Sequence, residues 1–142
     1  MNQLSSNTIH AIILRNWWML KLTYGLLLIV AGADKFFNLV TTWEKYIGPF
    51  VKTSVPLSSL QIVYLTGIFE IITGILILTI MTRIGAYIAA IWFLVVALNL
   101  LNMIIYMDIA VRDVIIAIGA IVLAQLTVIK EGSTPQTSSS FH

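Results

Sequence analysis

Four long apolar runs, separated by short polar breaks, limit what this chain can fold into more than any other feature of its sequence. A helix needs about 20 predominantly apolar residues to cross a hydrocarbon core of about 30 Å. We therefore expect transmembrane helices at about residues 18–37, 57–81, 84–106 and 109–129. Only 10% of the residues are charged, far fewer than in a soluble domain. The sequence predicts an all-α integral membrane protein.

The lengths of the connections predict how these helices are arranged. The second and third spans are separated only by residues 82–83, and the third and fourth only by residues 107–108. Such short links require antiparallel neighbours. The first connection, residues 38–56, is longer and amphipathic, with Trp43 and Tyr46 among charged residues. We expect an antiparallel bundle of four transmembrane helices, with an amphipathic interfacial segment on the membrane surface between helices 1 and 2.

The two ends of the chain are expected to lie outside this bundle. Residues 1–16 read as an N-terminal arm, residues 17–130 as the membrane domain and residues 131–142 as a disordered polar tail. The small residues of "IVAGA" resemble a signal-peptide cleavage site, but Tyr and Gly interrupt the apolar stretch before them. We therefore expect the first span to be retained.

Basic residues near the span ends suggest an orientation. Four lie at each membrane face: Arg15, Lys21, Arg83 and Lys130 on one, and Lys35, Lys45, Lys52 and Arg112 on the other. The tie is broken if Lys35 and Arg112 are paired with carboxylates inside the protein. The positive-inside rule then places both termini in the cytoplasm.

Several functions are excluded by missing side chains. The chain has no cysteine, which removes disulfides, thiolate metal sites, thiol redox chemistry and covalently attached haem. Both histidines, His10 and His142, lie outside the apolar runs, so bis-histidine haem ligation within the bilayer is excluded. The sequence contains no basic cluster of the kind that binds nucleic acid, and no nucleophile–base arrangement can be recognised in it. We expect a protein that is not an enzyme on its own.

Most strongly polar residues of the apolar region are predicted to share one half of the bundle. In an up-down-up-down arrangement, the end of the first span lies beside the end of the third and the start of the fourth. Ionisable residues at such depths are functional candidates by default. The candidate polar cluster consists of Asp34, Lys35, Glu70, Asn99, Asn102, Asp108, Arg112 and Asp113.

Helical spacing predicts that the cluster points into the bundle. One stripe of the fourth span contains Ala110, Asp113, Ala117, Ala120 and Ala124. In the second span, Glu70 lies between Gly67 and Gly74, near the middle of the membrane. Small residues are enriched where membrane helices approach closely. We therefore expect Asp113 and Glu70 to face protein.

A carboxylate in a low-dielectric interior needs either a partner or a proton. We expect a charge-balanced network of Asp34, Lys35, Arg112 and Asp113. The planar guanidinium of Arg112 suits two-point contact with a carboxylate. Glu70 has no basic neighbour in sequence, so we expect it to be largely uncharged and hydrogen-bonded to Thr66, Thr73 or an asparagine of the third span. Structural pairing and ligand contact both remain open for the cluster.

The remaining polar and aromatic residues have simpler expected roles. We expect the asparagines of the third span to form interhelical hydrogen bonds. Trp92 is expected to pack within the bundle. The membrane-interface anchors are expected to be Trp17, Trp18, Trp43 and Tyr46.

Three segments together resemble the DoxX/DoxD family of small bacterial four-helix membrane proteins. They are "KLTYGLLLIVAGADKFFN", "GIFEIITGILIL" followed at once by "TRIGAYIAA", and "MDIAVRDVIIAIGAIVLAQL". The resemblance covers roughly Leu20 to Leu126 and implies a four-helix bundle in the inner membrane. It also implies links to sulfur metabolism, oxidative-stress complexes or redox-enzyme maturation. One branch resembles a subunit of thiosulfate:quinone oxidoreductase. The cysteine chemistry of related quinone-reducing membrane proteins does not transfer to a chain without cysteine.

Three functions follow as hypotheses. The first is an accessory or scaffolding subunit that binds a larger membrane or redox protein. The second is a quinone- or small-anion-binding subunit of an oxidoreductase, in which Lys35 and Arg112 hold the ligand and Glu70 or Asp113 handles protons. The third is a small transporter or a proton pathway through Glu70. Contact with the lipid bilayer is expected in each case, and the alanine stripe fits either one bundle or a homo-oligomer.

Overall fold

The computed structural model describes residues 2–132, and every regular element among them is helical. The chain folds into α1 (Asn2–Phe37), η1 (Trp43–Tyr46), α2 (Pro49–Ser54), α3 (Ser59–Leu78), α4 (Thr82–Leu101) and α5 (Met107–Gly132). The expected all-α architecture is confirmed. The greater part of the expected C-terminal tail, residues 133–142, lies outside the described residues.

Three of the described helices, α3, α4 and α5, are long and apolar enough to cross a membrane. The expectation of four such helices is therefore supported for three. The first helix falls short in composition, because its apolar stretch is interrupted by Lys21 and Tyr24 and ends at Asp34 and Lys35. It is not short in length: α1 runs without a break from Asn2, through the segment predicted to be an N-terminal arm.

The helix ends explain why the observed bounds differ from those expected. The side chain of Ser58 accepts the backbone N–H of Gln61, and the Gln61 side chain accepts the N–H of Ser58, which starts α3 in a capping box. Asn38 adopts a left-handed conformation, with φ of 51°, and ends α1. The third apolar run was expected to remain helical to residue 106, but α4 ends at Leu101 and a turn containing left-handed Ile104 follows.

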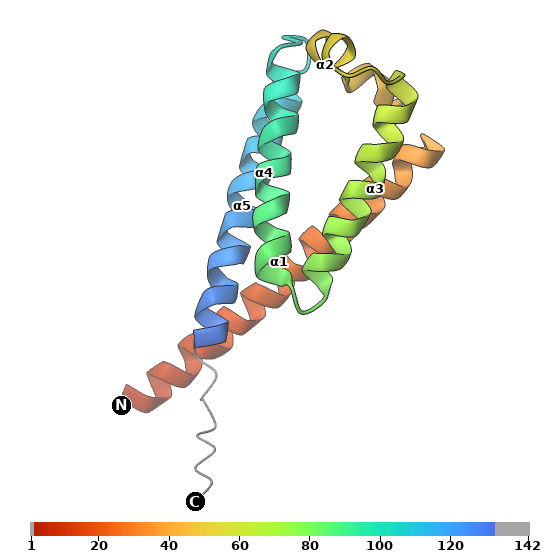
Figure 1. The fold of residues 1–142 in the computed structure, drawn as a ribbon. Helices are drawn as coiled ribbons and strands as arrows, with labels where there is room; N and C mark the ends of the chain where they lie inside the picture. Colours follow the sequence, from red (N-terminus) through yellow and green to blue (C-terminus); the bar gives the residue numbers. More distant parts are fainter. Residues whose placement is uncertain (1, 133–142) are drawn as a thin grey trace, which may run out of the picture.

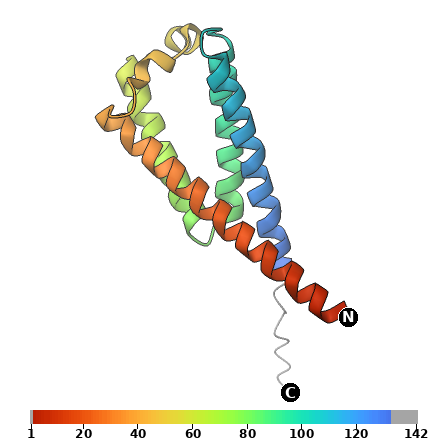
Figure 2. The same ribbon diagram turned by 180° about the vertical axis from the view of Figure 1, so that it is seen from behind.

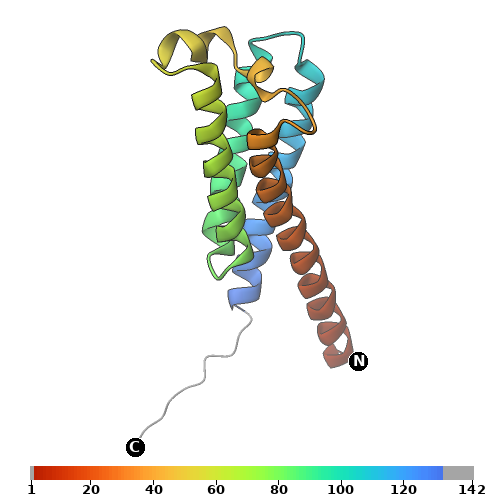
Figure 3. The same ribbon diagram turned by 90° about the vertical axis from the view of Figure 1, so that its right-hand side faces the viewer.

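The long helices form two closely packed pairs, α1 with α3 and α4 with α5. The pairs contact each other mainly through α3 with α4 and α1 with α5. Figures 1 and 2 show the pairs converging near the α3–α4 link and diverging towards the opposite end, where α2 bridges them. Viewed from the side in Figure 3, α1 extends beyond the bundle at its N-terminal end.

Glycines bring α1 and α3 into close contact. A Cβ on Gly32 would lie 2.6 Å from the carbonyl oxygen of Gly67, and one on Gly74 would lie 2.7 Å from that of Gly25. The two glycines of each helix are seven residues apart, so they lie on one face. Two antiparallel helices can therefore meet backbone to backbone at two levels, as membrane helices with small residues do.

Alanines have the corresponding role in the other pair. The predicted stripe of α5, including Asp113, is buried throughout, so its inward orientation is confirmed. Across from it, α4 buries Gly85, Ala86, Ala89, Ala90 and Ala97. The outer surfaces of the helices carry large exposed apolar side chains, such as Val30, Ile72, Ile91 and Ile115. An apolar exterior of this extent requires contact with lipid.

Candidate functional site

The centre of the polar cluster is an ion pair that the sequence reading did not predict. The ammonium group of Lys35 on α1 donates to Oε2 of Glu70 on α3, and both residues are buried. Because α1 and α3 meet at Gly32 and Gly67, three residues earlier on each helix, the glycine contact sets the register of the pair. The expectation that Glu70 lacks a basic partner and bonds to Thr66, Thr73 or an asparagine is wrong.

Two tryptophans complete the surroundings of this pair. The indole Nε1–H of Trp92 on α4 donates to Oε1 of Glu70 at 2.9 Å, so both carboxylate oxygens have a donor. The ring of Trp43 in η1 lies over Lys35, with 4.1 Å between the ammonium nitrogen and the ring centroid. A cation–π contact of this kind stabilises a cation that is shielded from water. Trp92 therefore binds a carboxylate in addition to packing.

Asp34 holds the loop that follows α1. Its Oδ1 accepts the backbone N–H groups of Leu39 and Val40 at 3.0 and 3.1 Å, and its Oδ2 accepts the indole N–H of Trp43 at 2.7 Å. These bonds fix η1 against the end of α1 and hold the Trp43 ring over Lys35. Asp34 therefore stabilises the loop by accepting its N–H groups. The sequence had instead predicted that Asp34 is a member of an ionic network.

Asp113 is buried but poorly partnered. The residue is 6% exposed, and its Oδ1 lies 3.9 Å from Nε of Arg112. Lys35 and Glu70 are close enough to act on its charge. A carboxylate in this position has acceptor capacity left over, because a distant guanidinium nitrogen satisfies little of it. Among the buried carboxylates of the cluster, Asp113 has the most capacity for a further donor.

Arg112 does not take part in a buried network. Its side chain is 67% exposed and points away from the bundle interior, apart from its long contact with Asp113. The predicted four-member network of Asp34, Lys35, Arg112 and Asp113 is therefore wrong. The cause is helical geometry: Arg112 and Asp113 are adjacent, so they lie about 100° apart around α5 and cannot both face inward.

The other predicted members lie at the margin. Asn99 connects α4 to the loop, because its Nδ2 donates to the carbonyl oxygen of Tyr46 at 2.7 Å and its Oδ1 accepts the N–H of Gly48 at 3.0 Å. Asn102 is exposed and donates to Leu98 of its own helix. Asp108 is exposed in the first turn of α5. The asparagines thus do not join two transmembrane helices, and only Asn99 supports the site.

The hydrogen bond between Trp92 and Glu70 could have been predicted from the geometry of the α3–α4 hairpin. Residues equidistant from a tight turn lie at the same level, and Glu70 and Trp92 are each 11 residues from Met81. A buried indole also needs an acceptor for its N–H. Trp17 follows the same rule: it is 3% exposed and donates to Oγ1 of Thr127, so it is not a lipid-facing anchor.

The chemistry available at this cluster is binding and charge compensation. Among residues 2–132, no group of three or more His, Asp or Glu side chains could hold a metal ion. Lys35 and Glu70 neutralise each other. Fold and site together define an all-helical integral membrane protein, in which a buried Lys35–Glu70 ion pair lies between α1 and α3.

The comparison with known families agrees with this class. The DoxX family model matches residues 17–103, and the chain therefore belongs to the DoxX family. The match includes Lys35 and Glu70 and ends before α5, so Arg112 and Asp113 lie beyond it. No curated protein and no solved structure matches the chain.

Proposed function

We propose that the protein is an accessory membrane subunit that binds a larger enzyme of redox or sulfur metabolism and does not itself catalyse a reaction. The supporting observation is that Lys35, Glu70 and Asp34, three of the ionisable groups that carry the family resemblance, are occupied by bonds within the chain. Groups that are bonded in this way hold the helices and the loop in place, and are not available to a substrate as a base or nucleophile.

The end of the bundle that carries η1 and α2 is suited to contact a partner. Arg112 is exposed there, as are Lys45 and Lys52. Phe50, which is 73% exposed, adds an apolar anchor on α2. Arginine and aromatic residues are enriched in protein interfaces, and an exposed guanidinium can bind a carboxylate of a partner at two points.

The first experiment is native mass spectrometry of the protein released from its own membranes in mild detergent. We expect a stoichiometric complex with a larger subunit. Arg112→Ala should reduce the recovered complex about tenfold, the equivalent of about 1.4 kcal/mol. Arg83→Ala, at the other end of the bundle, is the matched control and should leave recovery unchanged. The proposal fails if the wild-type protein is found alone, as a monomer or homodimer, in every mild extract.

Asp113 favours a second candidate function. Its acceptor capacity beside the Lys35–Glu70 pair suits a hydrogen-bond donor of a small ligand, such as the reduced form of a quinone. If this second function is correct, the native mass spectrum of the wild-type protein should show the bundle with a bound species of the mass of a quinone. This bound species should be absent from the spectrum of Asp113→Ala. A small anion such as thiosulfate would instead require Lys35 or Arg112, and its mass should disappear in Arg112→Ala.

We further propose that α1 is a fourth span, so that both helical ends of the chain face the cytoplasm of a bacterial inner membrane. The support is that α1 packs along α3, which is itself apolar enough to span. The absence of cysteine allows single cysteines to be labelled cleanly. We expect an impermeant maleimide applied to spheroplasts to label Lys52→Cys but not His10→Cys or Glu131→Cys. Equal labelling of His10→Cys and Lys52→Cys would exclude a crossing by α1.

A further inference from the structure

A second polar site lies at the opposite end of the bundle from the cluster described above. A hollow of about 220 Å³ opens between α1, the α3–α4 link and the end of α5. Its lining residues are Trp17, Lys21, Thr79, Ile80, Thr82, Thr127, Lys130 and Glu131. Two of them are lysines from helices that are far apart in sequence. This basic hollow has no role in the function proposed above.

Its two lysines are gathered around one indole ring. The ammonium nitrogen of Lys130 lies 3.7 Å from the ring centroid of Trp17, and that of Lys21 lies 4.8 Å from it. Trp17 is fixed by its hydrogen bond to Thr127. The lysines are close enough to repel each other. An anion between them would offset this repulsion, because it attracts both ammonium groups.

Lys21 is the more constrained of the two. It is 7% exposed, and its ammonium donates to the carbonyl oxygen of Thr79 at 2.8 Å, just beyond the end of α3. An ammonium group has three donors, and this bond uses one of them. The C-terminal end of a helix holds a cation in place but does not neutralise it. Lys21 is thus positioned, with donors remaining, at the wall of the hollow.

The hollow lies at the level of the lipid headgroups. Because α3 and α4 both cross the membrane, their link, residues 79–81, must lie at one membrane face. Thr79 of this link contacts Lys21, which places the ammonium at the same level. Ile80 is 97% exposed at the link, where an apolar side chain can enter lipid. The phosphates of a phospholipid bilayer lie in this region.

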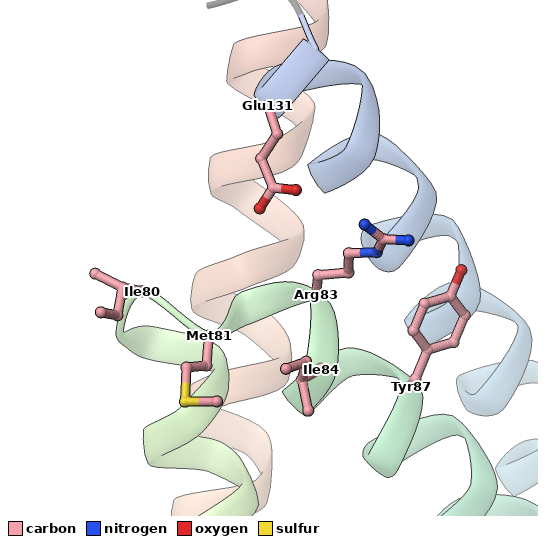
Figure 4. A pocket seen from close by; sticks show the side chains of 6 residues that line it. All are labelled: Ile80, Met81, Arg83, Ile84, Tyr87 and Glu131. Carbon is pink, nitrogen blue, oxygen red and sulfur yellow. The ribbon is translucent and has the colours of Figure 1, made fainter.

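An apolar groove adjoins the basic hollow. It encloses about 500 Å³, and its lining residues are Ile80, Met81, Arg83, Ile84, Tyr87 and Glu131. Ile80 and Glu131 line both spaces. Figure 4 shows Arg83 and Tyr87 reaching towards α5, with Glu131 reaching back from its end. The hollow and the groove together contain the basic residues Lys21, Lys130 and Arg83 and the acidic residue Glu131, so the combined site is positively charged.

We propose that this site binds an anionic phospholipid, with the phosphate between Lys21 and Lys130 and part of an acyl chain along Ile84 and Tyr87. The charge of the hollow selects the phosphate, and its depth matches the headgroups. The adjoining groove favours an amphiphile over free phosphate, because a free ion would use the hollow alone. A bound lipid would join α1, α4 and α5 at the end where the two helix pairs converge.

The test is lipid titration of the full-length detergent-solubilised protein by native mass spectrometry. We expect phosphatidylglycerol to bind more tightly than phosphatidylcholine. Lys130→Gln and Lys21→Gln should each weaken phosphatidylglycerol binding about fivefold, the effect typical of one basic residue near a charged membrane surface. Lys52→Gln removes an exposed lysine at the other end and should have no effect. Equal binding of the two lipids, or no difference between Lys130→Gln and Lys52→Gln, would overturn the proposal.

Two further arms identify the source of the phosphate and guard against misfolding. If millimolar inorganic phosphate displaces phosphatidylglycerol completely, the hollow is a free-phosphate site and the lipid proposal is wrong. Lys130 is partly exposed, so Lys130→Gln tests the site even if Lys21→Gln fails to fold. Lys21→Arg keeps the charge and should retain the preference for phosphatidylglycerol. Loss of that preference in Lys21→Arg would contradict a charge-based site.

Discussion

Replacing Gly67 with alanine is expected to destabilise the protein by about 1–3 kcal/mol, and replacing it with leucine by more. The new Cβ would lie 2.8 Å from the carbonyl oxygen of Gly32, closer than real Cβ contacts allow. That oxygen belongs to the backbone of α1, so no side-chain rotation can relieve the contact. The helices must move apart, and the packing that positions Lys35 opposite Glu70 is lost with them.

The change in unfolding free energy can be measured by SDS titration in mixed micelles, with helicity followed by circular dichroism. Gly132→Ala provides a matched control, because nothing lies within 4 Å of a Cβ there. We expect Gly132→Ala to unfold at the wild-type SDS concentration or slightly above it, since alanine is the better helix former. Gly32→Ala should behave like Gly67→Ala, since each Cβ points at the backbone of the other helix. Unfolding of Gly67→Ala at the wild-type SDS concentration would show that α1 and α3 are not in close contact.

The sequence predicted the inward faces of α3 and α5 correctly because helical periodicity is a local property. The stripe that places Asp113 inside α5 needs only the 3.6-residue repeat and the preference of close helix contacts for small side chains. The same periodicity shows that Glu70 is buried between Gly67 and Gly74. Local patterns of this kind predict which side chains face protein without any knowledge of the neighbouring helix.

Partner choice inside the cluster could not be read in the same way, because it depends on the register between helices. Lys35 pairs with Glu70 because the glycines of α1 and α3 set their antiparallel register, and the long connection between these helices conceals that register in the sequence. The pairing of Trp92 with Glu70 was accessible, since only a tight turn separates their helices. Because Arg112 and Asp113 are adjacent in sequence, both were expected to join one buried network. They point in different directions from α5, so only Asp113 is buried.

The convergence of the helix pairs has a consequence for where the protein can adapt to a partner. Close contacts join the pairs near the α3–α4 link, whereas η1, α2 and hydrogen bonds from Asn99 join them at the other end. Loops with few buried contacts open more readily than packed helices. The end that carries Arg112 is therefore the one better able to rearrange on binding, which agrees with its proposed role as the docking surface.

Removing one member of the Lys35–Glu70 pair should destabilise the protein far more than removing the charge of both. Lys35→Met leaves a carboxylate without its buried counter-ion, and Glu70→Gln leaves an ammonium in the same condition. Each is expected to cost about 3–5 kcal/mol, the usual effect of breaking a buried ion pair. In Lys35→Met/Glu70→Gln no net charge remains, and the glutamine oxygen can still accept the indole N–H of Trp92.

The double variant should therefore unfold within about 1–2 kcal/mol of the wild type, because replacing both partners of a buried pair with uncharged groups is often close to neutral. The four proteins form a double-mutant cycle, measured by SDS titration, with Lys52→Met as the control for loss of an exposed lysine. Additive costs would mean that the two side chains do not interact. The double variant also separates structure from function. If the pair only holds α1 to α3, the double variant should still be recovered with the larger subunit. If a fully folded double variant is recovered without the larger subunit, the pair has a direct role in binding.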